Sequence, residues 1–305
     1  MIRPNEDLPV LGIGLVLAAY LAFSFIDTSA KWLGLLGLSA LQLSFMRYVG
    51  HFVISTGLLV RDAEFGQLFS SEHRLLALIR GSLLMASTVL NFIAIQYLPL
   101  TLTSTILFSA PIIVCALSYP LLGERVGIVR WLAIMAGFVG ILVAIRPFDD
   151  SFHSAVFLSL AGATSFAFYT ILTRKLAGKE STNVLQFYSG AVGTLVLLPF
   201  AIVFWRNPET LLDWSIMVGL GFFGWLGHQM MTTAYRFADA SALTPFAYSF
   251  TLFLTVWSYL VFDHLPDRWT LAGALIIVAA GLMIWFRERK RGSMTKVNSE
   301  TPIQP

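Results

Sequence analysis

The stretch Arg80–Arg146 reads RGSLLMASTVLNFIAIQYLPLTLTSTILFSAPIIVCALSYPLLGERVGIVRWLAIMAGFVGILVAIR, and it recurs in weakly similar form over residues 220–287. The first two thirds align at a shift of 140 residues, and one inserted residue precedes the rest. The matches in this register are Ala94 with Ala234, Tyr97 with Phe237, Phe108 with Tyr248, Ser109 with Ser249, Ser118 with Ser258, Tyr119 with Tyr259, Gly140 with Gly281 and Arg146 with Arg287. Weak similarity between two hydrophobic halves is typical of secondary transporters.

The composition predicts a polytopic membrane protein. Of the 305 residues 57% are hydrophobic and 12% are charged, with a mean hydropathy of +0.76. A soluble domain is about 45–50% apolar and about 25% charged. Basic residues flank the apolar runs, so the sequence does not indicate a nucleic-acid partner. The lone Cys115 excludes an intrachain disulfide. The first apolar run is too long for a signal-peptide core, so we expect it to be retained.

Ten apolar segments are long enough to span a bilayer, which takes about 20 residues each. No charge occurs between Arg80 and Glu124, so this run must turn back, and Leu98-Pro99-Leu100 is the expected break. Its counterpart in the second half is Ala238-Asp239-Ala240. The predicted spans are residues 9–30, 39–60, 75–97, 101–121, 127–145, 153–173, 184–205, 214–235, 241–262 and 269–286.

The distribution of Lys and Arg predicts the orientation. With the N-terminus in the cytoplasm, fifteen of these residues fall on the cytoplasmic side, and only Lys31, Arg146, Arg206 and Arg268 fall on the other. We therefore expect both termini in the cytoplasm and a location in the inner (cytoplasmic) membrane. Residues 288–305 are basic and polar, and they are predicted to form a disordered cytoplasmic tail.

The first two spans repeat as well, in a register of 144 residues that aligns Lys31 with Lys175 and Gln42 with Gln186. Because each half has an odd number of spans, the second half enters the membrane from the opposite side. The predicted fold class is an all-α membrane protein with ten transmembrane helices in two inverted five-helix repeats. After an N-terminal segment, residues 1–8, the repeats are expected at residues 9–146 and 153–287.

Several features together resemble the drug/metabolite transporter superfamily, and more narrowly its EamA-type members. They are the five-plus-five spans, Gly123-Glu124 entering the fifth span, the related Asp263-His264, and the glycine-spaced fifth and tenth spans. The resemblance covers about residues 9–287. It implies metabolite transport by alternating access. It also implies a cavity lined by the first to fourth and sixth to ninth spans, with the fifth and tenth at the periphery.

Charged residues inside predicted spans are functional candidates because burying them is costly. Arg47 lies well inside the second span and could anchor an anionic group of a solute; the alternatives are a structural pair with Asp27, or snorkelling to the interface. Asp27 lies one turn before Lys31, so an i,i+4 ion pair at the outer interface is one reading. Proton coupling, or binding of a cationic group, is the other reading of Asp27.

Further candidates lie deep in the spans. His228 and Gln229 are placed mid-membrane and align with Thr88-Val89 in the repeat register, with Asn91 one turn further along. His228, Gln229 and Asn91 are predicted to contact the substrate or, alternatively, to form interhelical hydrogen bonds. The aromatic residues there could stack on a flat solute, or could simply pack. The favoured pair is Phe108-Ser109 with its repeat mate Tyr248-Ser249. The other aromatic candidates are Tyr20, Phe23, Tyr169, Tyr188 and Trp225.

Mobility is predicted from prolines and from charges at the cytoplasmic ends. Pro111 and Pro245 interrupt the fourth and ninth spans and could act as gates. Glu124 favourably begins the fifth helix, or it pairs with Lys175 when an inner gate shuts. The glycines of the fifth and tenth spans predict close helix packing; a homodimer through that face is a further alternative that the sequence does not itself indicate.

We expect a secondary carrier for a small organic metabolite and no cofactor or metal. The chain has no Gly-rich phosphate-binding loop, so it is not predicted to hydrolyse ATP directly. An amino-acid-like, nucleoside-like or carboxylate-bearing solute fits these residues. A carrier for a flavin or another aromatic compound is an alternative. A membrane-embedded enzyme acting on a lipid-linked substrate is another, although the five histidines are scattered and form no catalytic constellation.

Overall fold

The chain forms helices because an apolar segment in a bilayer must satisfy its backbone polar groups within itself. The computed structural model describes residues 9–62, 66, 68, 72–122, 128–147, 149–150, 152–176, 179–234, 237 and 243–300. In the first half the helices are α1 (Pro9–Leu35), α2 (Ala40–Arg61), α4 (Arg74–Tyr97), α5 (Leu100–Leu107), α6 (Ser109–Leu122) and α7 (Ile128–Ile145). In the second half they are α8 (Ala155–Leu176), α9 (Thr182–Val203), α10 (Leu211–Ala234), the 3₁₀ helix η1 (Thr244–Tyr248), α12 (Ser249–Phe262) and α13 (Arg268–Glu300).

These elements correspond to the ten predicted spans, and most boundaries agree within three residues. By length and composition, α1, α2, α4, α8 and α9 are each suited to crossing a membrane. The turn predicted at Leu98-Pro99-Leu100 is confirmed, since Leu98 caps α4 and Pro99 precedes α5. Its counterpart at residues 238–240 lies outside the described residues. Where the sequence predicts a disordered tail, the backbone of α13 is helical as far as Glu300.

The fourth and ninth spans are each divided at the same register position. α6 begins at Ser109 and α12 at Ser249, 140 residues later, and both helices have 14 residues. Pro111 lacks an N–H to donate to the carbonyl of Leu107, which explains why α5 ends there. Pro245 instead lies in the first turn of η1, where no helical hydrogen bond is lost.

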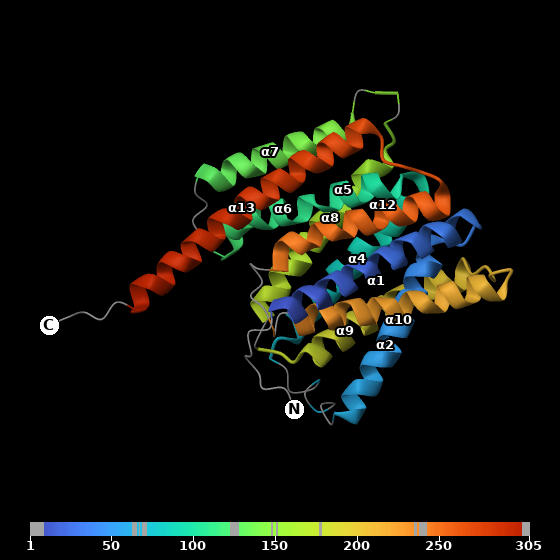
Figure 1. The fold of residues 1–305 in the computed structure, drawn as a ribbon. Coiled ribbons are helices and arrows are strands. Elements are labelled where there is room, and N and C mark those ends of the chain that lie inside the picture. Colours follow the sequence, from blue (N-terminus) through green and yellow to red (C-terminus); the bar gives the residue numbers. More distant parts are fainter. Residues whose placement is uncertain are drawn as a thin grey trace.

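The contacts between helices are preserved when each helix is replaced by its counterpart in the other half. The repeat registers map α1 to α8, α2 to α9, α4 to α10, and α7 to α13. Accordingly α1 packs on α10 and α4 on α8, while α2 packs on its own counterpart α9. Figure 1 shows α7 and α13 side by side at one edge of the bundle. The ten helices therefore form two inverted five-helix repeats, with the fifth and tenth at the periphery.

Glycines set how closely the helices approach. A Cβ added to Gly221 of α10 would lie 2.6 Å from the Cα of Gly50 on α2. At the periphery a Cβ on Gly140 of α7 would lie 3.0 Å from the carbonyl oxygen of Gly273 on α13. In both cases the added Cβ would meet main-chain atoms of the other helix, which cannot move aside as a flexible side chain can. The predicted role of the peripheral glycines in close packing is thus confirmed, and these glycines are buried within the chain.

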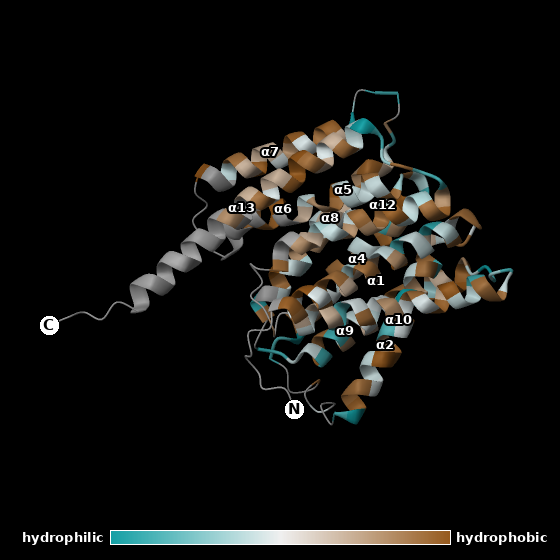
Figure 2. Cartoon of the chain, in the orientation of Figure 1, coloured by the Kyte–Doolittle hydropathy of each residue, from teal (hydrophilic) through white to brown (hydrophobic). Residues whose placement is uncertain are grey.

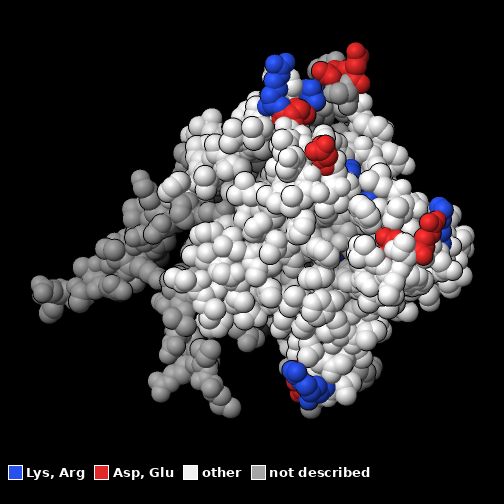
Figure 3. All heavy atoms as spheres, turned by 45° about the vertical axis from the view of Figure 1, so that its right-hand side comes forward, with Lys and Arg blue, Asp and Glu red and all other residues white. Residues whose placement is uncertain are grey.

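The described surface is largely apolar. In Figure 2 hydrophobic residues run along the length of the helices, and in Figure 3 charged side chains gather at the margins of a broad uncharged face. Large apolar side chains of α7 are exposed, among them Trp131, Leu132, Met135 and Phe138. Such a face is stable only when lipid covers it, so the chain is a multi-pass membrane protein.

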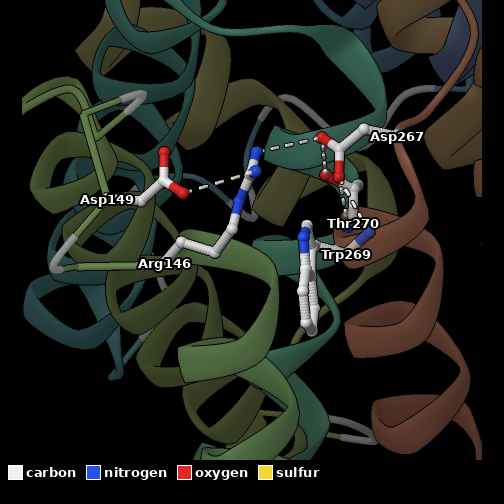
Figure 4. A network of polar contacts seen from close by, with 5 residues as sticks. All are labelled: Arg146, Asp149, Asp267, Trp269 and Thr270. Carbon is white, nitrogen blue, oxygen red and sulfur yellow. Dashed lines mark hydrogen bonds and ion pairs between the residues drawn. The ribbon is translucent and has the colours of Figure 1, made fainter.

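Polar contacts fasten α7 to α13 at one end (Figure 4). Arg146 directly follows α7 and has a φ of +50°. Its Nη2 lies 3.3 Å from Oδ2 of Asp267, and its Nη1 lies 3.9 Å from Oδ2 of Asp149. The Asp267 carboxylate also accepts hydrogen bonds from the backbone N–H groups of Trp269 (2.8 Å) and Thr270 (3.0 Å). One carboxylate therefore caps α13 and also joins it to the first half.

We predict that Gly221→Ala lowers stability, because the new methyl group must push apart the backbones of α2 and α10. The expected cost is about 1–3 kcal/mol, typical of overpacking. Denaturation in mixed detergent micelles, followed by tryptophan fluorescence, measures it. Gly57→Ala is the matched control on α2: a Cβ there meets nothing within 4 Å, and the substitution should stabilise by up to about 1 kcal/mol. Equal stabilisation by both substitutions would contradict the close approach.

A second prediction concerns pH. Partial burial tends to raise the pKa of the Asp267 carboxyl, but hydrogen bonds from Thr270 and Trp269 and the nearby Arg146 outweigh it and hold the pKa below its usual value. Its stabilising contribution is therefore present above the unfolded pKa of about 4 and is lost as the pH falls through the lower folded value. Asp267→Asn should lower the unfolding midpoint at pH 7, and the difference from the native chain should shrink towards pH 3. Asp150→Asn, at an exposed aspartate, should show no such trend.

Candidate functional site

The guanidinium of Arg47 is buried in the middle of the bundle with some of its donors unused. The residue is 7% exposed, and its Nη1 donates to Oγ1 of Thr88 on α4 (2.5 Å) and to the hydroxyl of Tyr48 (3.2 Å). The Nε atom is buried and has no hydrogen-bond partner among the described residues. Two neutral hydroxyls orient the group without neutralising its charge.

Glycines on neighbouring helices make room for this arrangement. A Cβ on Gly224 of α10 would lie 3.4 Å from Nε of Arg47, and a Cβ on Gly193 of α9 would overlap the Tyr48 ring. The guanidinium carbon of Arg47 also lies 5.2 Å from the centre of that ring. The elements α2, α4, α9 and α10 thus converge on one side chain.

His228 lies one helical turn after Gly224, on the same face of α10. Its ring centre is 5.0 Å from that of Phe23, 5.9 Å from that of His51 and 6.4 Å from that of Tyr169. Its Nε2 atom is buried and makes no hydrogen bond within the described chain. His51, by contrast, has a partner, because its Nε2 lies 3.0 Å from Oε1 of Gln186 on α9. The site therefore offers two buried nitrogen atoms, Arg47 Nε and His228 Nε2, that lack partners.

Asp27 is the buried carboxylate of this region, and its environment corrects one reading of the sequence. Its Oδ2 accepts a hydrogen bond from Nδ2 of Asn91 on α4 (3.0 Å). Lys31 forms no ion pair with it; Nζ donates instead to the carbonyls of Ile95 (2.9 Å) and Leu98 (2.7 Å). The predicted i,i+4 pair is wrong because the exposed carbonyls at the end of α4 offer acceptors that a helix considered alone lacks.

Arg47 also forms no ion pair with Asp27 within 4.0 Å, so the structural pair considered for it is not formed. Snorkelling is excluded too, since the side chain is buried. The interpretation of Arg47 as an anchor for an anionic group stays a prediction.

Sequence reasoning missed Arg80, which it assigned to the basic cytoplasmic margin. The residue is 4% exposed, and its Nη2 donates to the hydroxyl of Tyr169 (2.9 Å) while its Nη1 donates to Oγ of Ser189 (2.9 Å). The one available signal was its place six residues into an apolar helix. Tyr169, a predicted candidate, is brought into the site by this contact and by its proximity to His228.

The favoured aromatic pair does meet. The ring centres of Phe108 and Tyr248 are 5.1 Å apart at an angle of 72°. The hydroxyl of Tyr248, however, points at Gly281 of α13, towards the periphery. Oγ of Ser109 is buried and has no partner in the described chain, while Oγ of Ser249 donates to the carbonyl of Phe246 (2.7 Å). These residues form the crossing of the fourth and ninth spans.

Three other candidates lie away from Arg47. The hydroxyl of Tyr188 donates to the carbonyl of Leu68 (2.8 Å), beyond the end of α2. Trp225 and Gln229 line a separate open hollow together with Arg61 and Asp62. Tyr20 lies nearer to the site, since its ring centre is 6.2 Å from that of Phe23, which adjoins His228.

Of the gating candidates, Lys175 is exposed and Glu124 lies outside the described residues. The pair predicted between them therefore stays untested. Pro111 and Pro245 are placed in the backbone as described above. No group of three or more His, Cys, Asp or Glu residues that could hold a metal ion occurs among the residues that the structure describes.

Together these features define a class: a helical membrane protein of two inverted repeats that encloses a polar, positively charged centre. The chain belongs to the EamA-like transporter family, whose profile matches residues 10–146 and 153–286. The resemblance found in the sequence is confirmed.

Individual relatives cover nearly the whole chain. The S-adenosylmethionine uptake transporter of Rickettsia bellii is 30% identical, over 92% of this chain and 95% of its own. The pseudopaline exporter of Pseudomonas aeruginosa is 30% identical over 90% and 95%. The riboflavin transporter of Vibrio cholerae is 26% identical over 93% and 95%. A protein crystal structure with 14% identity superposes with a TM-score of 0.61 over 92% of this chain and 98% of its own, which supports the fold.

Proposed function

We propose that this protein is a secondary transporter that carries a small organic metabolite bearing an anionic group across the cytoplasmic membrane. The observation that carries the proposal is the buried guanidinium of Arg47: among the described residues its Nε has no partner, and its Nη1 donates to the neutral hydroxyls of Tyr48 and Thr88. Both termini are proposed to lie in the cytoplasm, because that orientation places most Lys and Arg residues on the cytoplasmic side.

The energetic argument is that burying a charge without a counter-charge is costly. The effective penalty in proteins is several kcal/mol per ion, and opposite charge with good hydrogen bonds offsets it. Arg presents a planar fork that suits a carboxylate or phosphate. An anionic group of a solute would use the donors of Arg47 that the protein leaves free. The carboxylate of Asp27, held by Asn91, could take a cationic group of the same solute.

The relatives support the class of activity. Their names describe uptake of S-adenosylmethionine, export of pseudopaline and transport of riboflavin. All three are small organic metabolites, and both directions of movement occur among them. The family and these names also favour a transporter over a membrane-embedded enzyme.

Alternating access is supported by two differences between the ends of the bundle. Gln42 holds the main chain of Arg206 in both directions: Nε2 donates to its carbonyl (2.7 Å), and Oε1 accepts from its N–H (3.0 Å). The repeat mate of Gln42 is Gln186, which would reach the main chain at Asp62 if the halves were equivalent. Gln186 contacts His51 instead.

The lysines show the same difference. Lys31 closes the end of α4 through two carbonyls, whereas its repeat mate Lys175 is exposed and makes no hydrogen bond or ion pair with any part of the chain that the structure describes. We therefore assign the structure to a state that is closed at the outer end. In the opposite state Gln186 and Lys175 would form the contacts that Gln42 and Lys31 form here.

A carrier for a flavin or other aromatic compound is the second candidate. It is favoured by the aromatic residues around His228, namely Phe23 and Tyr169, and by the likeness to a riboflavin transporter. It differs from the first proposal in needing no anionic group, so its dependence on Arg47 would be weak.

Transport is tested in two steps. A thermal-shift screen of the purified protein against a metabolite library selects solutes, and uptake of the radiolabelled hits into proteoliposomes follows. For an anionic solute, Arg47→Gln should raise the half-saturating concentration at least about 30-fold, because it removes a buried charged hydrogen-bonding partner. Arg47→Lys should restore little, since Lys lacks the fork.

Arg61→Gln is the matched control, as this exposed arginine on α2 forms its ion pair within the described chain with the neighbouring Asp62. Its uptake should equal that of the native chain. Unchanged uptake by Arg47→Gln would remove Arg47 as the anchor, and product formation without flux would indicate an enzyme.

The assignment of the closed end is tested by cysteine labelling in detergent, where both ends are reachable. In a Cys115→Ser background, a cysteine at the buried Leu38 should react slowly with a maleimide. Adding Gln42→Leu should speed the reaction severalfold, because it removes both hydrogen bonds to Arg206. A cysteine at the exposed Leu211 should react at the same rate with or without Gln42→Leu. If Gln42→Leu leaves the Leu38 site unreactive, this contact does not hold the end closed.

A further inference from the structure

Arg80 carries a second buried positive charge that no described carboxylate neutralises. Its four hydrogen bonds go to uncharged acceptors on two helices: Oγ1 of Thr173 and the hydroxyl of Tyr169 on α8, and the carbonyl of Leu185 and Oγ of Ser189 on α9. Its guanidinium carbon also lies 4.5 Å from the centre of the Tyr169 ring. These contacts fix the group firmly and leave its charge uncompensated.

A cross-link between α4, α8 and α9 does not require a charge. Neutral side chains could supply hydrogen bonds to a hydroxyl and a carbonyl at a lower desolvation cost. A buried guanidinium in a membrane span is expected to have a partner or a function. Neither Arg80 nor Arg47 forms an ion pair with the described residues. The buried described residues include these two guanidinium groups and two aspartates: Asp27, held by Asn91, and Asp213, held by Thr210 and Trp32 at the start of α10.

Both guanidinium groups border the same polar interior. His228 is connected to both: one turn before it on α10, Gly224 adjoins Nε of Arg47, and its ring centre is 6.4 Å from that of Tyr169. Tyr169 in turn adjoins Arg80. Arg47 lies seven residues from the start of α2 and Arg80 six residues from the start of α4, and these helices start at opposite ends of the bundle. The two charges are therefore displaced from each other along the transport direction.

We propose that Arg80 is a second anion-binding residue of this site, and that the solute class carries two anionic groups separated by a spacer. One group would bind at Arg47 and the other at Arg80, with the body of the solute beside His228 and Tyr169. The inference rests on the proposed transport function and narrows its substrate. A solute of this kind compensates both guanidinium groups at once, and an ammonium group on it could meet Asp27.

The test uses linear α,ω-dicarboxylates from succinate to azelate, each compared with its own monoamide, which has the same length and one charge less. Binding to the purified full-length protein is measured by thermal shift and by isothermal titration. At one chain length the dicarboxylate should bind at least about tenfold tighter than its monoamide, as expected for one added charged hydrogen-bonded contact. The optimal length reports the spacing of the two groups.

Substitutions separate the charge of Arg80 from its role as a cross-link. Arg80→Gln should reduce the preference for the dicarboxylate to about onefold while monoamide binding persists. Arg80→Lys keeps the charge and loses most hydrogen bonds, so it should be less stable yet retain part of the preference. Thr173→Val removes one hydrogen bond of the cross-link without touching the charge, and it should retain the preference in full.

Two results would overturn the proposal: a preference that survives Arg80→Gln, or a native protein that shows no preference at any chain length. Either leaves the transport proposal standing if monoanionic solutes are still taken up in a manner that depends on Arg47. Absence of flux for every solute that binds would instead count against transport itself.

Discussion

The requirement that every buried polar group find a partner governs this structure, because the surrounding apolar helices offer none. Lys31 satisfies it with the carbonyls at the end of α4, Gln42 with the main chain of Arg206, and Asp27 with Asn91. Arg47 and His228 do not satisfy it in full. Seven other buried side-chain atoms of the described residues also lack a partner, namely six serine or threonine hydroxyls and Nε of Arg146. Arg47 and His228 supply the unpaired nitrogen atoms at the centre of the bundle, and we propose that a bound solute would use them.

Because the two repeats share one fold, a difference between the contacts of equivalent residues is informative. The halves agree in helix order and in packing, and α6 and α12 begin at equivalent residues. They differ at Gln42 and Gln186, where equivalent side chains make different contacts. The proposed alternating mechanism needs two packings of related energy, and an inverted duplication is a way in which one chain could provide them.

Some of the residues that converge on the candidate site were named from the sequence, and the contacts that were not foreseen have a common cause. Arg47 and His228 stood out because burying a charged or polar residue deep in an apolar run is costly, so such a residue is expected to have a function. Arg80 was missed because a residue near a helix end can face either the solvent or the bundle, and sequence does not show which. The Asp27–Lys31 pair was wrong for a similar reason, since spacing along one helix says nothing about acceptors on the next. Depth in the membrane was the only basis for predicting Tyr188, Trp225 and Gln229 as site residues. In the structure Tyr188 contacts Leu68, and the other two line the open hollow beside Arg61 and Asp62.

The sequence by itself determined the spans, their inverted duplication and the family, because hydropathy and repeat register are properties of order along the chain. Tertiary structure alone decided which polar side chains share an interior. Helices of similar depth can rotate about their axes without any change in hydropathy, and only the packing of α2, α4, α8, α9 and α10 fixes that rotation. The close approach of Gly50 to Gly221 locks it, since a Cβ on Gly221 would collide with the Cα of Gly50.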